Sequence, residues 1–373
     1  MPREGVFRAR PRPALWRSLP GLVLLGILVS CASAPTREAP RQPVASGGVE
    51  WIDVHVHLVG GRGPWAEDSS GAARAAVAAM DEAGIRQAVV MPPPQVRGGP
   101  PPYDYESFIA ALKPYPGRFA FLGGGGTLNP LIQEAGQRGG IAEEDVRRFG
   151  EKAEEILRQG GAGFGEISAH HLSLMSGHPY ESVPADHPLL LRLTDIAARH
   201  GVVIDLHFDP VTEDVGLPGR LASPSNPPVL RANLAAFERL LAHNRKARIV
   251  WAHAGSDPLG QWTAALSREL LRRHPNLHMS LRMGGGVPQN LVLDAAGEIK
   301  PEWLSLFREF PDRFVIGGDQ FFVTPQLRGP GLIFAGRAPL IRERTRRFLS
   351  RLPPDLAGQI GRENAIRLYR LTR

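Results

Sequence analysis

Short apolar runs rich in Val, Ile and Leu alternate along the chain with longer stretches in which apolar residues recur at helical spacing. Runs of this kind are typical of parallel strands buried on both faces, and the longer stretches are typical of amphipathic helices. Eight runs are predicted strands: Trp51–Leu58, Gln87–Met91, Arg118–Gly123, Gly163–Ser168, Val202–His207, Arg248–His253, Leu277–Arg282 and Arg313–Asp319.

The stretches between the predicted strands are predicted helices: Ala72–Ala83, Ile141–Gln159, Leu189–His200, Val229–His243, Thr263–His274 and Pro301–Phe310. Two further helices, near Arg337–Arg351 and Asp355–Arg370, are expected to pack across the fold after the last strand. Regular alternation of strands and helices indicates βαβ units, and eight units match the usual size of a (β/α)8 TIM barrel, about 250 residues.

A doubly wound open sheet is the rival architecture, but no glycine-rich phosphate loop follows the first predicted strand. The glycine run at 123–126 lacks the spacing of such a loop. We therefore predict a mobile loop at the barrel rim for this run, and an α/β fold with a TIM barrel over residues 49–373.

The first 30 residues have the pattern of an export signal, with arginines followed by a short apolar run that ends at Leu28-Val29-Ser30-Cys31. This ending resembles the lipobox of bacterial lipoproteins, in which the cysteine carries the lipid. We predict a lipoprotein signal peptide over residues 1–30 and lipidation at Cys31. A Pro-, Ala-, Ser- and Gly-rich segment over 31–48 is then a flexible tether. The protein is expected in the cell envelope, lipid-anchored and facing the periplasm or the exterior.

The charge and the cysteine content of the chain limit the binding partners and the metal ligands that can be expected. The formal charge is +7, but five arginines and one glutamate in residues 1–30 account for +4 of it, so +3 remains. This excess gives no indication of nucleic-acid binding. Cys31 is the only cysteine, so any metal must be bound by histidines and carboxylates.

Metal-binding residue types gather at the ends of predicted strands. His55 and His57 stand two residues apart in the first strand, where alternation would place them with Asp53 on one face and Ile52, Val54 and Val56 on the other. His207, His253 and Asp319 each end a later strand. Active sites of TIM barrels assemble at the carboxyl ends of the strands, so these residues predict one metal site for zinc or a similar ion.

This arrangement resembles the amidohydrolase superfamily, and most closely its amidohydrolase-2 branch of metal-dependent hydrolases and decarboxylases. The segment Ile360-Gly-Arg-Glu-Asn-Ala-Ile-Arg-Leu-Tyr369 is similar to that branch's C-terminal helix. The resemblance implies a divalent ion, Zn²⁺ or alternatively Mn²⁺. It also implies a water activated by that ion, with Asp319 as the base and His253 orienting the water or stabilising negative charge.

The number of ions stays open. Many members of the superfamily have a carboxylated lysine on the fourth strand, where this chain has Glu166 and no lysine. Glu166 is expected either to bind metal or to contact ligands and substrate. With one ion, the resemblance implies His55, His57, His207 and Asp319 as ligands. With two, His207 and His253 share the second ion, with Glu166 between them.

Several nearby residues have weaker predicted roles. Arg282, His170 and His171 follow strands and are candidate substrate contacts, with a rim salt bridge or loop structure as the alternatives. Asp53 and Asp205 each precede a candidate ligand by two residues, a spacing suited to supporting that histidine.

The favoured function is hydrolysis of a C–O or C–N bond in a small molecule such as a lactone, ester or amide. A non-oxidative decarboxylase of the same branch is the first alternative, and a non-catalytic envelope binding protein is the second. The sequence leaves the substrate and a homo-oligomeric state open.

Overall fold

The computed structural model describes residues 49–61, 68–96, 103–174, 178–222, 225–326 and 336–372. All of these ranges belong to one compact unit that runs from Val44 to Arg373. The predicted signal peptide, the tether and Cys31 lie outside the described residues, so those assignments stay predictions. No helix within the described ranges is long and apolar enough to cross a membrane.

The unit is built around a sheet of parallel strands in the order expected for a barrel. Each strand of the main series pairs with its neighbours in parallel. In chain order the strands are β1 (Trp51–Val59), β2 (Ile85–Val90), β3 (Phe119–Phe121), β4 (Gly123–Gly124), β5 (Gly163–His171), β7 (Val203–Phe208), β10 (Arg248–Ala254), β11 (Leu277–Leu281), β12 (Phe314–Ile316) and β13 (Gln320–Val323).

The barrel closes through β3 and β4, which are two halves of one strand position. β3 pairs with β2, β4 pairs with β5, and a single residue, Leu122, connects them. The amide of Leu122 donates to the carbonyl of Val90 on one side, at 2.9 Å, and Ala162 donates to Phe121 on the other, at 2.8 Å. The eighth position is likewise shared, because β12 and β13 both pair with β1. The predicted eight-position TIM barrel is confirmed.

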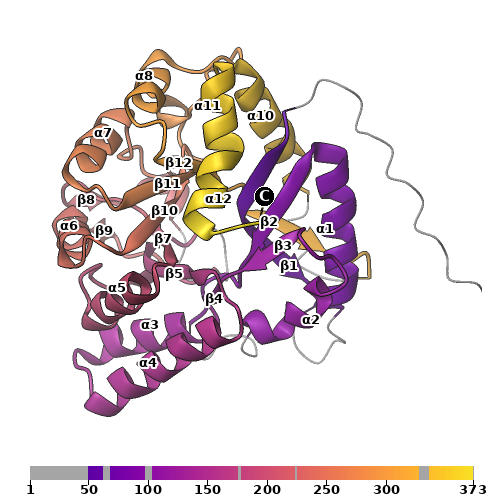
Figure 1. Ribbon diagram of the computed structural model, residues 1–373. Helices are drawn as coiled ribbons and strands as arrows, with labels where there is room; N and C mark the ends of the chain where they lie inside the picture. Colours follow the sequence, from indigo (N-terminus) through magenta and orange to yellow (C-terminus); the bar gives the residue numbers. More distant parts are fainter. Residues whose placement is uncertain are drawn as a thin grey trace, which may run out of the picture. The chain divides into compact units, whose positions relative to one another are not determined.

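Helices surround the strands (Figure 1). They are α1 (Ser69–Ala83), α2 (Ile109–Leu112), α3 (Leu128–Arg138), α4 (Glu143–Arg158), α5 (Pro188–His200), α6 (Leu234–His243), α7 (Ala264–Arg273), α8 (Pro301–Glu309), α10 (Ala338–Arg351), α11 (Pro354–Gly358) and α12 (Asn364–Tyr369), with the π-helix η4 (Gln359–Glu363) joining the last two. The predicted closing helices are therefore present, the second as three short pieces.

Short elements decorate the connections between strands and helices. They are the 3-10 turns η1 (Tyr105–Ser107), η2 (Gly219–Leu221) and η3 (Pro288–Asn290), the strand β6 (Glu181–Ser182) against β5, and the hairpin of β8 (Val215–Gly216) with β9 (Val229–Leu230). The hairpin corrects one prediction. Val229 and Leu230 were expected to begin a helix, but they pair with β8 and the helix begins at Leu234.

The glycine run also departs from expectation. Gly123 and Gly124 form β4, and the whole run at 123–126 is buried rather than a mobile loop at the rim. Any Cβ at Gly125 would collide with the backbone carbonyl oxygens of Pro92 and Pro93. The glycines therefore allow neighbouring backbone segments to approach closely inside the fold.

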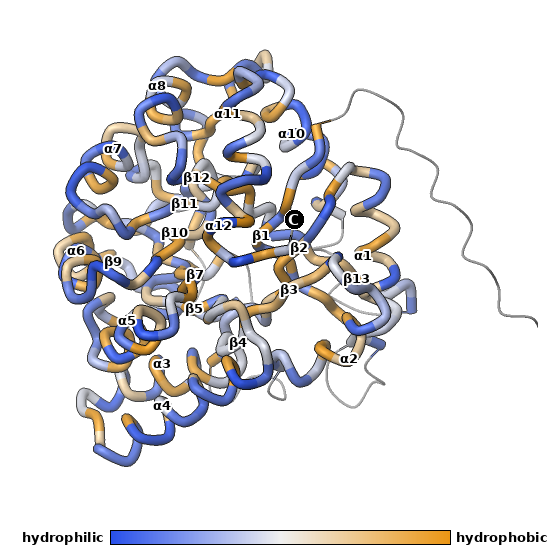
Figure 2. Tube along the Cα trace, in the orientation of Figure 1, coloured by the Kyte–Doolittle hydropathy of each residue, from blue (hydrophilic) through white to orange (hydrophobic). Residues whose placement is uncertain are grey.

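The two largest of three apolar clusters fill the unit, and one of these two lies inside the barrel. Figure 2 shows apolar stretches along the central strands and mixed positions on the helices around them. The larger cluster lies between strands and helices. The smaller one takes residues from six strand positions, among them Ile52, Val203, Val250 and Val315, and from α12 it takes Ala365, Leu368 and Tyr369. Helix α12 thus seals the amino-terminal end of the barrel, which we call the base.

Candidate metal centre

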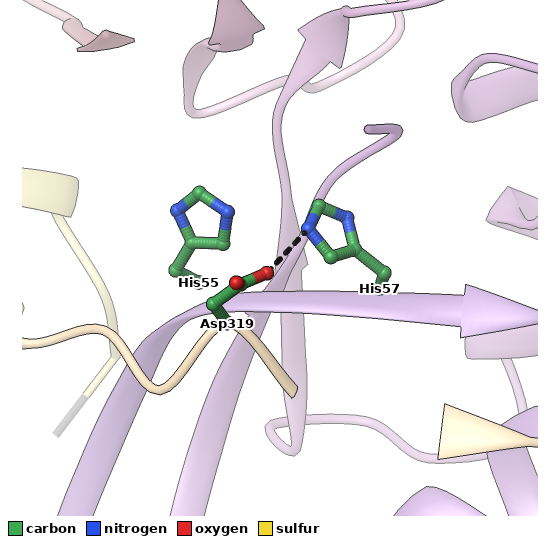
Figure 3. Close-up of side chains that lie close together, drawn as sticks. All are labelled: His55, His57 and Asp319. Atoms are coloured by element: carbon green, nitrogen blue, oxygen red, sulfur yellow. Dashed lines mark ion pairs between the residues drawn. The ribbon is translucent and has the colours of Figure 1, made fainter. Parts of the chain in front are cut away.

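The parallel barrel brings the predicted ligands to its carboxyl end, the mouth. His55 and His57 come from β1, Glu166 from β5, His207 from β7 and His253 from β10. Asp319 lies between β12 and β13. All are buried except Asp319, whose side chain is 19% exposed. Figure 3 shows the His55 and His57 rings on either side of the Asp319 carboxylate, with an ion pair drawn from His57.

Two of these residues have backbone conformations that side chains rarely adopt. His253 has a φ of +74° and Asp319 a φ of +49°, both in the left-handed region. Non-glycine residues in this region cost free energy and cluster at functional sites. In His253 the turn comes where the pairing register of β10 shifts, between Trp251 and Ala254. Local strain therefore aims both side chains at the mouth.

The simple alternation predicted for β1 is wrong. Ile52 and Val54 belong to the cluster inside the barrel, whereas Val56 packs in the outer cluster against the helices. The register with β2 shifts between Asp53 and Val56, so the strand changes face there. The shift is what allows apolar residues at the base and His55 at the mouth to share the interior.

Glu166 lies at the centre of the histidines, with one oxygen facing each pair. Its Oε2 is 3.3 Å from His55 Nε2 and 3.6 Å from His57 Nε2. Its Oε1 is 2.9 Å from His207 Nδ1 and 3.1 Å from His253 Nε2. Burial alone would raise the pKa of Glu166, but charged His55 and the hydrogen bonds from His207 and His253 hold it well below the usual value. The carboxylate is therefore ionised and touches every candidate histidine.

Asp319 joins the same cluster from the opposite side. Its Oδ1 is 3.3 Å from His57 Nε2, and its Oδ2 is 3.2 Å from the Nη2 of Arg282. Burial would raise the pKa of Asp319, but the charge of Arg282 lowers it below its ordinary range. Arg282 also donates to Ser256 Oγ at 2.8 Å. The predicted rim salt bridge of Arg282 is thus made with the candidate base itself.

The tautomer of His57 indicates that a cation belongs in this cluster. The Nδ1 of His57 lies 2.8 Å from the carbonyl of Met91, which can only accept, so Nδ1 carries the proton in the neutral ring. Nε2 then presents a lone pair toward Glu166 and Asp319, and it has no hydrogen-bond partner among the described residues. Lone pairs and carboxylates that face one another suit a divalent metal ion.

Two ligand groups within the described residues have donor atoms close enough for one ion. The first is His55, His57 and Asp319, and the second is His55, Glu166 and His253. Imidazole nitrogens and carboxylate oxygens are ligands that zinc accepts. The residues present therefore fit a divalent metal centre, with His207 beside the second group.

Other carboxylates hold the histidine rings from outside the cluster. Asp205 was expected to support His207, but its Oδ1 lies 3.1 Å from His55 Nδ1. His207 has Asp209 instead, with Oδ2 at 3.5 Å from Nε2. Sequence reasoning missed Asp209 because it considered aspartates two residues before a candidate ligand, and Asp209 stands two residues after His207. Asp53 accepts from the amide of His55 at 3.1 Å and from that of Gly318 at 2.8 Å.

The two histidines predicted as substrate contacts differ. His170 is buried, with Nδ1 2.7 Å from the Asp209 carbonyl and Nε2 3.2 Å from the Tyr180 hydroxyl, so the protein occupies both nitrogens. The ring of His171 lies beside that of His207, with centroids 3.9 Å apart and the planes tilted by 58°. Of the two, His171 is the one placed against the candidate ligands.

Comparisons with known proteins agree with this assembly. A family model described as Amidohydrolase matches residues 52–371. No curated protein sequence matches the chain.

Several solved structures are similar to the chain at low identity. One is a variant of organophosphorus hydrolase from Deinococcus radiodurans, at 16% identity and a TM-score of 0.49, over 86% of this chain and 93% of that one. Another is amidohydrolase 2 from Bifidobacterium longum subsp. infantis, at 12% identity and a TM-score of 0.39, over 87% and 100%. A third is an amidohydrolase from Mycobacterium avium subsp. paratuberculosis K-10, at 13% identity and a TM-score of 0.38, over 79% and 73%.

Proposed function

Because the chain belongs to the amidohydrolase family and is a metal-dependent hydrolase, we propose that it cleaves a C–O or C–N bond of a small molecule. Two divalent ions would be held by Glu166 together with the histidines and Asp319 around it. The substrate class is a lactone, an ester or an amide. The ion proposed is Zn²⁺, since every candidate ligand is an imidazole or a carboxylate.

The observation that carries the two-ion proposal is the division of the Glu166 oxygens. Oε2 faces His55 and His57, whereas Oε1 faces His207 and His253. If Glu166 supported a single ion, its two oxygens would not need to face two different pairs of histidines. In this proposal Asp319 completes the first group through Oδ1, which lies beside His57.

The protein's own groups have separate roles in the proposed reaction. When bound, divalent ions lower the pKa of water and polarise carbonyl oxygens. Asp319 is ionised and can accept a proton at the carboxylate and return it to the leaving group. Arg282 holds Oδ2 of Asp319 in place, and Asp205 and Met91 fix the rings of His55 and His57. Burial of these groups excludes bulk water from the site.

Arg282 favours hydrolysis over decarboxylation. A decarboxylase of this branch would be expected to hold its substrate's carboxylate with an arginine at the mouth. Arg282 is the arginine that reaches the candidate ligands among the described residues, and its guanidinium is bound to Asp319 and Ser256. Both Nη atoms of the arginine are therefore engaged by the candidate base and by Ser256, which leaves Nε alone to a substrate.

Metal content measured by mass spectrometry tests the centre. The matched preparations are the parent, the His55→Ala/His57→Ala double variant, and a His200→Ala/His243→Ala control whose rings pair with surface carboxylates. We expect two ions per chain in the parent and in the control, and loss in the first variant. One ion per parent chain would contradict the proposal of two ions, and none after reconstitution with zinc or manganese would contradict the metal centre.

The reaction is tested with a panel of lactones, esters and amides in ¹⁸O-labelled water. Incorporation of one labelled oxygen into the product, lost on removal of metal, is the expected result. Release of carbon dioxide without labelling would identify a decarboxylase instead.

A further inference from the structure

Four arginines gather around α12 at the base of the barrel. Arg248 is the first residue of β10, and Arg313 directly precedes β12. Arg367 belongs to α12, and Arg370 follows it. The strands are parallel, so residues at their starts share one end of the barrel. Hydrogen bonds join the group: Arg248 Nη1 donates to the carbonyl of Leu368 in α12, at 3.3 Å.

These arginines donate hydrogen bonds to backbone carbonyls, and few carboxylates form ion pairs with them. Arg367 donates to the Asp312 carbonyl at 2.6 Å and Arg370 to the His200 carbonyl at 3.0 Å. Arg313 donates to the Leu277 carbonyl at 2.9 Å. Among the described residues, the one carboxylate that forms an ion pair with any of the four is Asp312, 3.5 Å from Arg313 Nε. Four positive charges therefore face one negative charge.

The groups affect one another electrostatically. Burial, and then the charges of Arg370 and Arg367, lower the pKa of Arg248. Burial, and then the charge of Arg313, lower the pKa of the neighbouring His278 to about 3. Arg367 and Arg370 remain exposed to solvent. An outside anion would relieve this repulsion, because within the described part of the chain Asp312 alone forms an ion pair with the group.

The chain also enters the barrel at this end. The described fold begins at Val49 and leads directly into Trp51, the first residue of β1. Cys31, the predicted site of the lipid, precedes Val49 by 18 residues. The predicted tether therefore joins the fold at the base rather than at the mouth.

We propose that the base of the barrel, through Arg248, Arg313, Arg367 and Arg370, binds the anionic headgroups of a phospholipid surface. Arginine suits this partner because its planar guanidinium forms paired hydrogen bonds to phosphate oxygens. Binding in this orientation leaves the mouth facing away from the bilayer, where soluble substrates arrive. The surface is independent of the proposed hydrolysis and of lipidation.

Vesicle flotation of the compact unit, residues 44–373, tests the surface without the leader or Cys31. The probes are vesicles of phosphatidylcholine alone and of phosphatidylcholine mixed with phosphatidylglycerol. We expect binding to the mixed vesicles only, and loss at high salt, which screens charges. An Arg367→Gln/Arg370→Gln variant should bind roughly tenfold to thirtyfold more weakly, as expected for two basic residues at a membrane surface.

The matched control removes the same charge at the other end of the barrel. Arg220 and Arg231 are exposed near β8 and β9, where Arg220 donates to the Pro258 carbonyl and Arg231 pairs with Asp214. An Arg220→Gln/Arg231→Gln variant should bind vesicles as the parent does. Metal content and the unfolding midpoint of both variants should match the parent, which separates lost binding from lost folding.

Three outcomes would overturn the proposal. They are absence of parent binding to mixed vesicles, equal weakening in both double variants, and stabilisation of the parent by inorganic pyrophosphate without vesicle binding. The last would assign the arginines to a small soluble anion. Because the unit lacks Cys31, failure here leaves lipidation and hydrolysis untouched, and each keeps its own test.

Discussion

The mouth and the base of the barrel both concentrate ionisable side chains, but they do so with opposite chemistry. At the mouth, carboxylates and histidines are in direct contact, and Arg282 forms an ion pair with Asp319. At the base, arginines are bound by backbone carbonyls. Buried charges are tolerated only when paired, so the groups at the mouth form a network in which each charge has a partner. At the base, Arg367 and Arg370 stay exposed, where an outside partner can neutralise them.

Of the changes proposed, removing the charge of Glu166 at the mouth should have the largest effect on metal content and hydrolysis. Glu166→Gln removes the carboxylate shared by both histidine pairs, so metal content should fall and hydrolysis should drop by roughly a thousandfold. The control is Glu181→Gln, another buried carboxylate, which binds Asn129. Metal analysis and product formation provide the measurements. A Glu166→Gln protein with normal metal content would show that the network is structural, and the contrast between the two ends would fail.

At the base, the largest effect should be on folding rather than on chemistry. Leu368 is 1% exposed and fills the barrel interior, so Leu368→Ala should lower the free energy of unfolding by about 2–5 kcal/mol. Leu340, a leucine of α10 that is 53% exposed, provides the control as Leu340→Ala. Urea denaturation measures both. The fraction of the Leu368→Ala protein that remains folded should keep its full metal content. A lower metal content per folded chain would show that the base and the mouth of the barrel are energetically coupled.

The buried histidine near the base should make stability depend on pH. The folded pKa of His278 is about 3, below its ordinary 6.5, because burial and the charge of Arg313 disfavour the proton. The unfolded chain therefore binds more protons between these values, and stability falls as the pH drops below about 6.5. Going from about pH 7.5 to about pH 5.5 should cost about 1 kcal/mol more in the parent than in His278→Gln. Equal pH dependence in both proteins would contradict this assignment.

The smallest effect should come from a surface arginine of the base. Arg370→Gln loses one exposed hydrogen bond to the His200 carbonyl, so the free energy of unfolding should change by less than about 1 kcal/mol. Thermal unfolding beside Arg231→Gln gives the comparison. A much larger loss in Arg370→Gln would mean that the base arginines exist for stability, and their interpretation as a binding surface would lose its support.

Most of the barrel could be predicted because each buried parallel strand leaves an apolar run in the sequence. The predicted strand Val202–His207, for example, is found as Val203–Phe208. Irregular backbone was not predictable. The last predicted strand, Arg313–Asp319, ends at Ile316 in β12, and β13 follows it only from Gln320, because the backbone leaves the ladder at two glycines and turns to positive φ at Asp319. Helix α3, which contains a proline and a glycine, gave no clear helical pattern.

The members of the candidate site could be predicted, but their contacts could not. Strand ends identified His55, His207 and Asp319 because a parallel barrel brings all such ends together. Which oxygen of Glu166 faces which histidine depends on side-chain geometry that spacing does not encode. The same limit explains Asp205, assigned by sequence proximity to His207 but found against His55 on another strand.

Helix α12 also has a consequence for the order of folding. Ala365, Leu368 and Tyr369 occupy the barrel interior together with Ile52, from which more than 300 residues of chain separate them. Individual βα units are built from local contacts, but the interior at the base stays open to water until α12 meets β1. Contacts between residues so far apart in the chain form slowly, because the intervening loop must first be closed. The sealing of the base by α12 is therefore expected to be a late event in folding.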